Sequence, residues 1–386
     1  MSATARVAMF LGAGASKAFG APLNNEILPT IIKKIKDESL FGNDVEDRRT
    51  LRQLLKKIMP GIEDINPIYV QITEVLSLID YMLLCALVPA PQEKAEHLVL
   101  CRRLLDRAIL DLLPGIHRPA GEEPRSDLQR LAKWMFDVGN KSHFSLVSTN
   151  YDEIVERGLY ECFMHSEDTG RRFDRVNKAV NFGLNWRDGE SDIVFQSPLD
   201  SRHSVLKLHG SVDWMKCELC GWIVCNDGYA LKNEPFHVVS DQPENPFNRC
   251  HCGHSPLSPV MVAPSLVRDI RDINILNVWK SACEELRTAD HWFMIGYSLP
   301  VEDYAIRSML IRALKTRKSR PQIDVYLRHR NPETEARYGA FLGEFTYHTT
   351  GMEGFIAEVV DKRLYVDAPE LQASNEDLGS PMLLNC

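Results

Sequence analysis

The stretch that most constrains the fold is residues 144–160, with the sequence F-S-L-V-S-T-N-Y-D-E-I-V-E-R-G-L-Y. Its first four residues form a short apolar run that is typical of a buried strand. Asp152 and Glu153 then open a pattern with apolar residues on one side, which predicts a helix with acids in its first turn. In an open α/β sheet, ligands bind at the carboxyl ends of the strands. Asn150 is therefore expected where a small molecule would bind.

A second strand is predicted at residues 7–11, V-A-M-F-L, and it runs directly into the turn Gly12-Ala13-Gly14-Ala15-Ser16. Glycines in such a turn let the backbone approach a pyrophosphate closely. The turn lacks the G-K-[ST] ending of a Walker A loop and is not a full G-x-G-x-x-G. On its own it indicates either a nucleotide-binding turn or a plain tight turn.

Between these two strands, apolar residues at three- and four-residue spacing predict a helical insert over residues 31–140. The predicted helices cover residues 31–35, 51–58, 69–87 and 98–113. Two prolines and a G-E-E-P run predict an exposed loop at residues 117–125. The simplest role of this insert is packing and partner surface.

The rest of the chain returns to an alternation of strands and helices. Strands are predicted at residues 194–196, 204–208, 260–263, 291–295 and 323–327, and helices at 273–286 and 301–313. This pattern predicts an α/β fold with a doubly wound, mainly parallel, Rossmann-like sheet. Residues 367–386 are polar and without periodicity, which predicts a mobile tail or a subunit contact.

A histidine follows the strand predicted at residues 204–208, in the sequence His209-Gly210-Ser211. A lone histidine is more often structural than catalytic. Its place after a strand favours a functional role, because strand-end residues in such sheets gather at one edge.

Four cysteines stand in two close pairs. Cys217 and Cys220 form C-x-x-C, Cys250 and Cys252 form C-x-C, and a glycine follows each pair. Two such knuckles predict a tetrahedral zinc site rather than unligated thiols, with Cys225, His251 and His254 as possible substitutes. Four protein ligands leave no open position, so the zinc is expected to be structural.

Bulk properties bound the class of protein. The chain has 386 residues, 44% hydrophobic content and a formal charge of -8, which argues against a broad nucleic-acid-binding surface. The N-terminus shows no signal peptide, and the longest apolar run, residues 75–88, is too short to span a bilayer. Ten cysteines without a secretion signal indicate reduced thiols or metal ligation, and thus a cytoplasmic protein.

The order of these motifs resembles the sirtuin superfamily. The series is the G-A-G-A-S turn, T-N-Y-D at 149–152, L-H-G-S at 208–211, the cysteine knuckles, G-Y-S-L at 296–299 and a final strand-end asparagine. The match covers roughly Arg6 to Asn331, with a looser match in the insert. There, I-T-E-V-L-S-L-I-D at 72–80 is similar to a segment of prokaryotic sirtuin-like proteins.

The resemblance implies specific roles. Asn150 would match the catalytic asparagine beside the nicotinamide ribose, and His209 would match the general base. The implied NAD-binding residues are Gly12, Ala13, Gly14, Ser16, Thr149, Asp152, Gly296, Ser298 and Asn331. The implied ligands of the structural zinc are Cys217, Cys220, Cys250 and Cys252. For Asn331 the alternative is a strand-end cap beside Pro332.

Three departures set this chain apart from the protein-deacetylating sirtuins. Residues 21–26 are A-P-L-N-N-E, without the Asp-Phe-Arg of those enzymes, and Thr149 replaces a glutamine. Residues 262–265 are V-A-P-S in place of the phenylalanine-glycine-glutamate peptide clamp. The resemblance is therefore closest to the sirtuin-like NAD hydrolases of bacterial antiphage defence. It implies an NAD glycohydrolase, with an NAD-dependent protein deacylase as the alternative and a non-catalytic NAD or ADP-ribose sensor as a third reading.

The resemblance also implies partners. Uncontrolled NAD cleavage would kill the cell, so we expect gating by a homo-oligomer or by a partner, such as a HerA-type DNA translocase or an Argonaute protein. The expected division is an NAD-binding core at 1–30, 141–215 and 256–345, a helical insert at 31–140, a zinc module at 216–255 and a C-terminal tail at 346–386.

Overall fold

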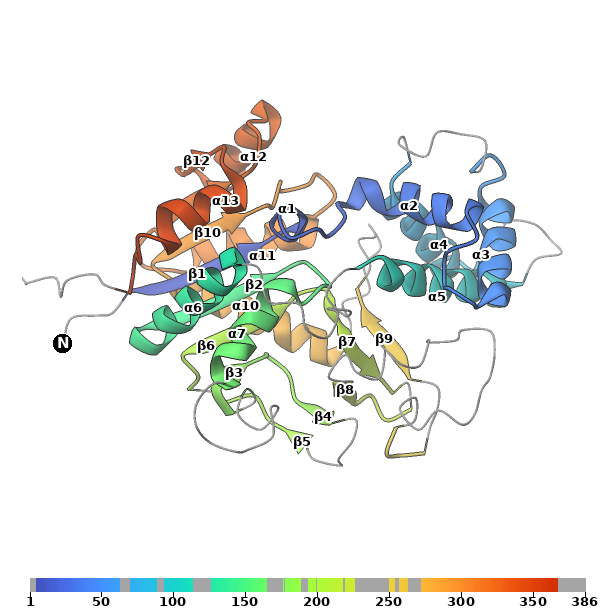
Figure 1. Ribbon diagram of the computed structural model, residues 1–386, viewed down its shortest axis with the longest axis horizontal. Coiled ribbons are helices and arrows are strands. Elements are labelled where there is room, and N and C mark those ends of the chain that lie inside the picture. The colour runs from blue at the N-terminus through green and yellow to red at the C-terminus, as the bar shows by residue number, and fades with distance from the viewer. Residues whose placement is uncertain are drawn as a thin grey trace, which may run out of the picture.

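A computed structural model describes most of the chain (Figure 1). The described residues are 5–62, 70–88, 94–113, 126–164, 176, 178–188, 194–198, 200–217, 219–225, 250–253, 257–262 and 272–366. Four sequence expectations lie outside them: the loop at 117–125, His254, residues 263–265 after the cysteines and the tail at 367–386.

The centre of the protein is a seven-stranded sheet in which every described pairing is parallel. Its order is β12-β11-β10-β1-β2-β6-β3. The strands are β1 Arg6–Leu11, β2 His143–Ser148, β3 Val180–Asn181, β6 His203–Lys207, β10 His291–Ile295, β11 Gln322–Tyr326 and β12 Thr346–His348. The predicted α/β class and parallel sheet are confirmed.

Helices cover both faces of this sheet. Alternate residues of β1 point to opposite sides of the sheet and both sets are apolar, so each face is buried under helices. Ala8 and Phe10 pack in the core that includes α10 Ile273–Thr288, α11 Tyr304–Lys315 and α12 Pro332–Leu342. The other face carries Met9 and packs against α6 Ser126–Lys141, α7 Ile154–Met164, α13 Gly351–Phe355 and a π-helical turn at Ile356–Val360. There the ring of Trp134 lies edge-on to Phe144 and to Phe355, at centroid distances of 5.8 and 5.5 Å.

The strand order reverses at β1. From β1 the chain moves outward through β2 to β6, and β10 then returns to the other side of β1. In open α/β sheets, such a reversal opens a crevice beyond the carboxyl ends of the central strands. The crevice here lies where β1, β2 and β10 end, which are the strand ends that precede the glycine turn, Asn150 and Gly296.

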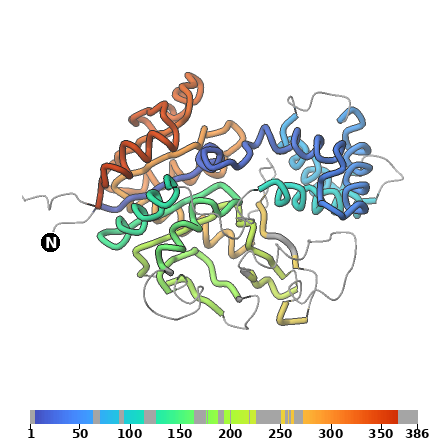
Figure 2. The backbone as a smooth tube through the Cα atoms, viewed as in Figure 1, coloured from blue at the N-terminus to red at the C-terminus, as the bar shows by residue number. Residues whose placement is uncertain are grey.

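In the described part of the insert between β1 and β2, four helices share a hydrophobic core of their own. They are α2 Asn24–Lys36, α3 Val45–Ile58, α4 Ile72–Leu84 and α5 Ala95–Leu112, and they confirm the four predicted helical stretches. Figure 2 shows them projecting from one end of the sheet. Helix α6 belongs to the same sequence segment, but its buried face, which includes Trp134 and Val138, packs on the sheet instead.

A second sheet of five strands extends from the crevice, in the order β5-β4-β8-β7-β9. Its strands are β4 Trp186–Asp188, β5 Val194–Phe195, β7 Gly210–Lys216, β8 Ile223–Cys225 and β9 Ser258–Met261. The sequence predicted β5 and the position of β9 to within two residues. It did not predict β7, which starts directly after His209.

The C-terminal region is more ordered than the sequence indicated. Residues 346–366 were expected in the tail, but β12 joins the sheet and Phe355 and Val366 are buried in the core. A strand of three residues, Thr346–His348, is too short to show an alternating pattern. Within the described part of the chain, no helix has both the length and the apolar character needed to cross a bilayer.

Candidate functional site

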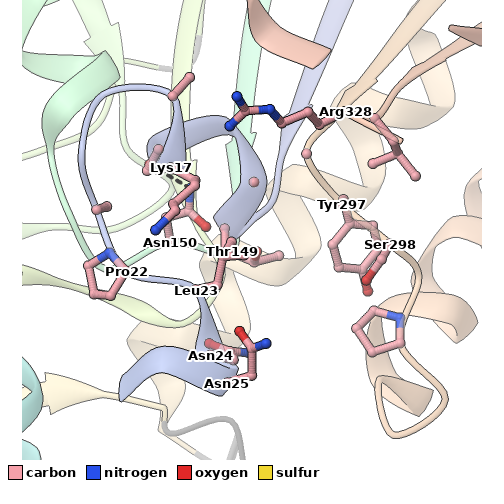
Figure 3. Close-up of a pocket in the computed structure, with 18 of the residues that line it drawn as sticks. Lys17, Pro22, Leu23, Asn24, Asn25, Thr149, Asn150, Tyr297, Ser298 and Arg328 are labelled. Atoms are coloured by element: carbon pink, nitrogen blue, oxygen red, sulfur yellow. Dashed lines mark hydrogen bonds between the residues drawn. The ribbon is translucent and has the colours of Figure 1, made fainter. Parts of the chain in front are cut away.

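A cavity of about 730 Å³ lies beyond the carboxyl ends of the central strands (Figure 3). Its walls come from the glycine turn, from residues 149–152 after β2, from 296–303 after β10 and from 326–331 at the end of β11. Residues 21–25, before and within the start of α2, close another side. This volume is within the range of roughly 300–1,000 Å³ that is usual for small-molecule sites.

Three glycines let the first strand turn lie directly against the turn after β10. A Cβ on Gly12 would lie 2.6 Å from the carbonyl oxygen of Gly296, and one on Gly14 would lie 2.9 Å from its Cα. Gly296 itself has φ +64°, and a Cβ there would meet the backbone nitrogen of Ala15 at 2.0 Å. Hydrogen bonds from Gly12 N to Ile295 O and from Gly14 N to Gly296 O fix the contact. Close packing of two strand ends explains these glycines.

The side chain of Asn150 is held in one orientation. Its Nδ2 donates to the carbonyl oxygen of Gly12 at 3.0 Å and to Ser16 Oγ at 2.9 Å. Because a carbonyl can only accept, the amide nitrogen must face Gly12. Both amide hydrogens are thereby used, which leaves Oδ1 as the side-chain atom that can accept a hydrogen bond in the cavity.

A polar chain behind Asn150 fixes this arrangement. Ser16 Oγ donates to Asp152 Oδ1 at 3.0 Å, and Asp152 Oδ1 also accepts from the backbone nitrogen of Ile154 at the start of α7. Lys207 Nζ donates to the carbonyl oxygen of Asp152 and, at 2.7 Å, to Glu156 Oε1. Burial alone would lower the pKa of Lys207, but the nearby Glu156 and Asp152 carboxylates outweigh it and raise that pKa. A buried ammonium thus anchors the chain.

His209 follows β6 and lines the same cavity. Its Nδ1 lies 3.1 Å from the carbonyl oxygen of Thr149. The carbonyl accepts, so Nδ1 carries the hydrogen, and in the neutral ring the lone pair belongs to Nε2. The backbone of His209 is tied to the second sheet, because its carbonyl accepts from Val262 N at 2.8 Å.

All of the predicted binding and catalytic residues except Gly12 line this one cavity. Gly12 lies beneath it and acts through its carbonyl oxygen on Asn150. Asn331 lines the cavity and also caps α12, because its Oδ1 accepts from Thr334 N at 3.0 Å. The cap that was the alternative reading of Asn331 is therefore present at the edge of the cavity.

Sequence reasoning missed several residues of the wall. They are Asn24, Asn25, Gln71, Tyr297, Arg328 and Arg337. Tyr297 and Arg328 each lie one or two residues beyond a predicted strand, so a systematic search of strand ends would have found them. Asn24 and Gln71 start helices of the insert, and nothing in the local sequence indicates that these helices face the sheet.

The four cysteines form a compact cluster at the far end of β7 from His209. Their sulfur atoms all lie within 4.8 Å of one another, with Cys217 to Cys252 at 3.5 Å and Cys220 to Cys250 at 3.4 Å. Four sulfurs bound to one tetrahedral zinc at about 2.3 Å would lie about 3.8 Å apart. The cluster can therefore hold a metal ion.

The glycine after each cysteine pair closes its knuckle. Gly221 N donates to Cys217 O and Gly253 N donates to Cys250 O, both at 2.8 Å. Both glycines have positive φ, +73° and +86°, which other residues adopt at a cost. Of the alternative ligands, His251 is exposed and outside the cluster.

The chain matches no protein-family model, and no curated protein sequence is significantly similar to it.

Proposed function

We propose that this protein is an NAD glycohydrolase that cleaves NAD with water to nicotinamide and ADP-ribose. The observation that carries the proposal is the fixed amide of Asn150, which offers an acceptor oxygen in the cavity that His209 also lines. On this proposal the parallel sheet is a Rossmann-like dinucleotide-binding core. The dinucleotide lies across the strand ends, with nicotinamide ribose toward Asn150 and adenosine toward Ser298 and Asn331.

The reaction breaks the bond between ribose C1′ and the nicotinamide nitrogen. The electron pair leaves with nicotinamide, and C1′ becomes an oxocarbenium-like centre, as in glycoside cleavage. A water molecule then attacks C1′. Asn150 Oδ1 can accept a hydrogen bond from that water or from a ribose hydroxyl, which directs a lone pair of the water toward the carbon.

His209 takes the proton that the water loses. The tautomer with hydrogen on Nδ1 places the accepting lone pair on Nε2, and the Thr149 carbonyl maintains that tautomer. The proton then passes to solvent, so the net reaction yields nicotinamide, ADP-ribose and one proton.

We also propose that the cysteine cluster holds a structural zinc ion. Zinc bound by four thiolates has no open position for substrate. The zinc ion would connect the end of β7 to the segment at 250–253. It would so stabilise the paired strands β7 and β8, of which β7 begins directly after His209. Bound zinc supplies a rigid cross-link there and no step of the reaction.

The test is release of nicotinamide from NAD by the purified full-length protein, without peptide. We expect release by the wild type and a loss of at least 100-fold in Asn150→Ala and His209→Ala. Ser145→Ala is a matched control. Ser145 is buried on β2, the strand that precedes Asn150, and its hydroxyl donates to Glu285 instead of contacting the site. Release that persists in Asn150→Ala would refute the proposal.

The second candidate is an NAD-dependent protein deacylase, which the cysteine cluster favours because the deacetylating sirtuins share such a module. An acetylated peptide in the same assay separates the two. Deacetylated peptide formed with NAD would favour the deacylase.

In the setting of antiphage defence, we propose that the α2–α5 insert and the chain beyond residue 366 carry the contacts that gate cleavage.

A further inference from the structure

The cavity contains an arginine whose charge no described residue neutralises. Arg328 is the second residue after the end of β11, and it lines the cavity. Within the described part of the chain, its guanidinium makes no hydrogen bond or ion pair. Figure 3 shows its side chain extending from the strand end toward α1 Ala13–Lys17. The planar guanidinium cation can therefore contact a ligand that binds in the cavity beside the glycine turn.

The two other cations of the wall are already used. Lys17 Nζ lies 2.8 and 2.7 Å from the two carboxylate oxygens of Glu26. Arg337 donates to the carbonyl oxygens of Leu299 and Ser298 at 3.1 and 3.3 Å, so it braces the turn after β10. Neither is available to a ligand without losing a contact of the protein.

The remaining charges of the wall are negative. Four carboxylates line the cavity, those of Asp152, Glu302, Asp303 and Glu353. Asp152 accepts from Ser16, and Asp303 accepts from the Tyr297 hydroxyl at 2.8 Å. An anionic ligand therefore needs a cation at its own position in this cavity.

The backbone beneath Arg328 is held firmly. Leu327 N donates to His348 O at 3.0 Å, and Gly351 N donates to Leu327 O at 3.1 Å. Gly351 has φ +61°, and a Cβ there would lie 3.5 Å from the Arg328 Cα. The start of α13 thus packs against the base of the arginine and fixes the direction in which it leaves the strand.

We infer that Arg328 binds the diphosphate of the dinucleotide, an inference that rests on the proposed function. The glycine turn offers close backbone approach but no charge, and α1 has only five residues. A guanidinium presents several N–H groups in a planar fork that matches two oxygens of a phosphate. Arg328 therefore supplies the charge that the turn lacks.

The experiment measures ligand binding, which needs no catalysis. Calorimetric affinities for ADP-ribose and for adenosine are compared in the full-length wild type, Arg328→Gln, Arg328→Lys and Arg330→Gln. Arg330 is the matched control, because it lies two residues away, outside the cavity, and pairs with Glu335 at 2.7 Å. Melting temperatures establish that each variant is folded.

We expect Arg328→Gln to weaken ADP-ribose binding by about 10- to 100-fold, as for loss of a charged hydrogen-bonding partner. Adenosine should bind it within twofold of wild type, and Arg328→Lys should recover part of the ADP-ribose affinity. Unchanged ADP-ribose affinity in Arg328→Gln, an equal loss for adenosine, or a wild type that does not bind ADP-ribose would overturn the inference. Binding that depends on Arg328, with NAD left intact both by the purified protein and by extract of cells that contain it, would refute the hydrolase and leave this inference standing.

Discussion

At the scale of single residues, the site depends on one amide held from behind. Asn150 is fixed by a backbone carbonyl and a serine, and the serine is fixed by an aspartate whose own carbonyl binds a buried lysine. Such a hydrogen-bonded series stabilises one orientation of the amide. Because the serine hydroxyl donates its one hydrogen to the aspartate, its oxygen is left to accept from the asparagine nitrogen. Activity should therefore respond to residues that act through the orientation of Asn150.

Ser16→Ala tests this positioning role. It removes the bond from Asn150 Nδ2 and the bond to Asp152, but leaves the Gly12 bond in place. We expect kcat for nicotinamide release to fall by about fivefold, since a neutral hydrogen bond contributes about 1 kcal/mol. Initial rates over a range of NAD concentrations give the comparison, with Ser145→Ala again as the control. Equal kcat values in Ser16→Ala and wild type would contradict the role.

Lys207 stabilises the folded protein through the same series of hydrogen bonds. Lys207→Met leaves Glu156 buried without its partner, so we expect a loss of about 3 kcal/mol in the free energy of unfolding. Adding Glu156→Gln to Lys207→Met should recover more than half of it, because the uncompensated charge is gone. Urea unfolding at neutral pH measures both. A double variant no more stable than Lys207→Met would show that the charge pair is not the cause.

At the scale of elements, the β7 ribbon links the cysteine cluster to His209. The sequence predicted both ends of this ribbon but not the ribbon itself. Residues 210–216 include glycine, serine and lysine. Gly210 has φ +83°, and a Cβ there would lie 1.9 Å from the carbonyl oxygen of Val260. That requirement is tertiary, so local propensity does not show it.

Metal content tests the cluster. We expect about one zinc per chain in the purified protein, measured by plasma mass spectrometry, and a loss of most of it in Cys217→Ser. Cys283→Ser is the control, because Cys283 is partly buried on α10, away from the cluster. Chelation of the wild type should lower its melting temperature and leave that of Cys217→Ser unchanged. Wild-type protein without zinc would contradict the assignment.

At the scale of the whole molecule, the last part of the described chain is fastened to the sheet by a network around Asp324. The two oxygens of Asp324 accept from His291 Nε2 and His348 Nε2, each at 2.7 Å, and His291 Nδ1 meets the Tyr365 hydroxyl. Burial alone would raise the pKa of Asp324, but these hydrogen bonds outweigh it and lower that pKa to about 2.

The sign of this shift gives a pH prediction. The folded protein holds the ionised carboxylate more tightly than the unfolded chain does, so Asp324 stabilises the fold above about pH 4. That contribution is lost as the pH falls from about 4 to about 2. Thermal melts across this range should show a smaller decrease in Asp324→Asn than in wild type. Parallel decreases in the two proteins would mean that Asp324 does not contribute.

The sequence predicted the central sheet well because its strands are continuous apolar runs with polar strand ends. The same property brought Asn150, His209 and the glycine turn forward as candidates, and the structure places them around one cavity. It did not predict that Arg328 faces this cavity, or that residues 346–366 complete the core. Both features depend on packing between segments that are far apart in the chain. The sequence of a short segment such as Thr346–His348 gives no information about that packing.

The measurement that tests the central claim most directly is the balance of products formed from NAD, with and without an acetylated peptide. Chromatography of nicotinamide and ADP-ribose after incubation with the purified protein, and with extract of cells that contain it, gives the two amounts. We predict equal amounts of both products without peptide, and no deacetylated peptide when peptide is present. Nicotinamide formed only with the acetylated peptide, or NAD left intact in both preparations, would contradict the account.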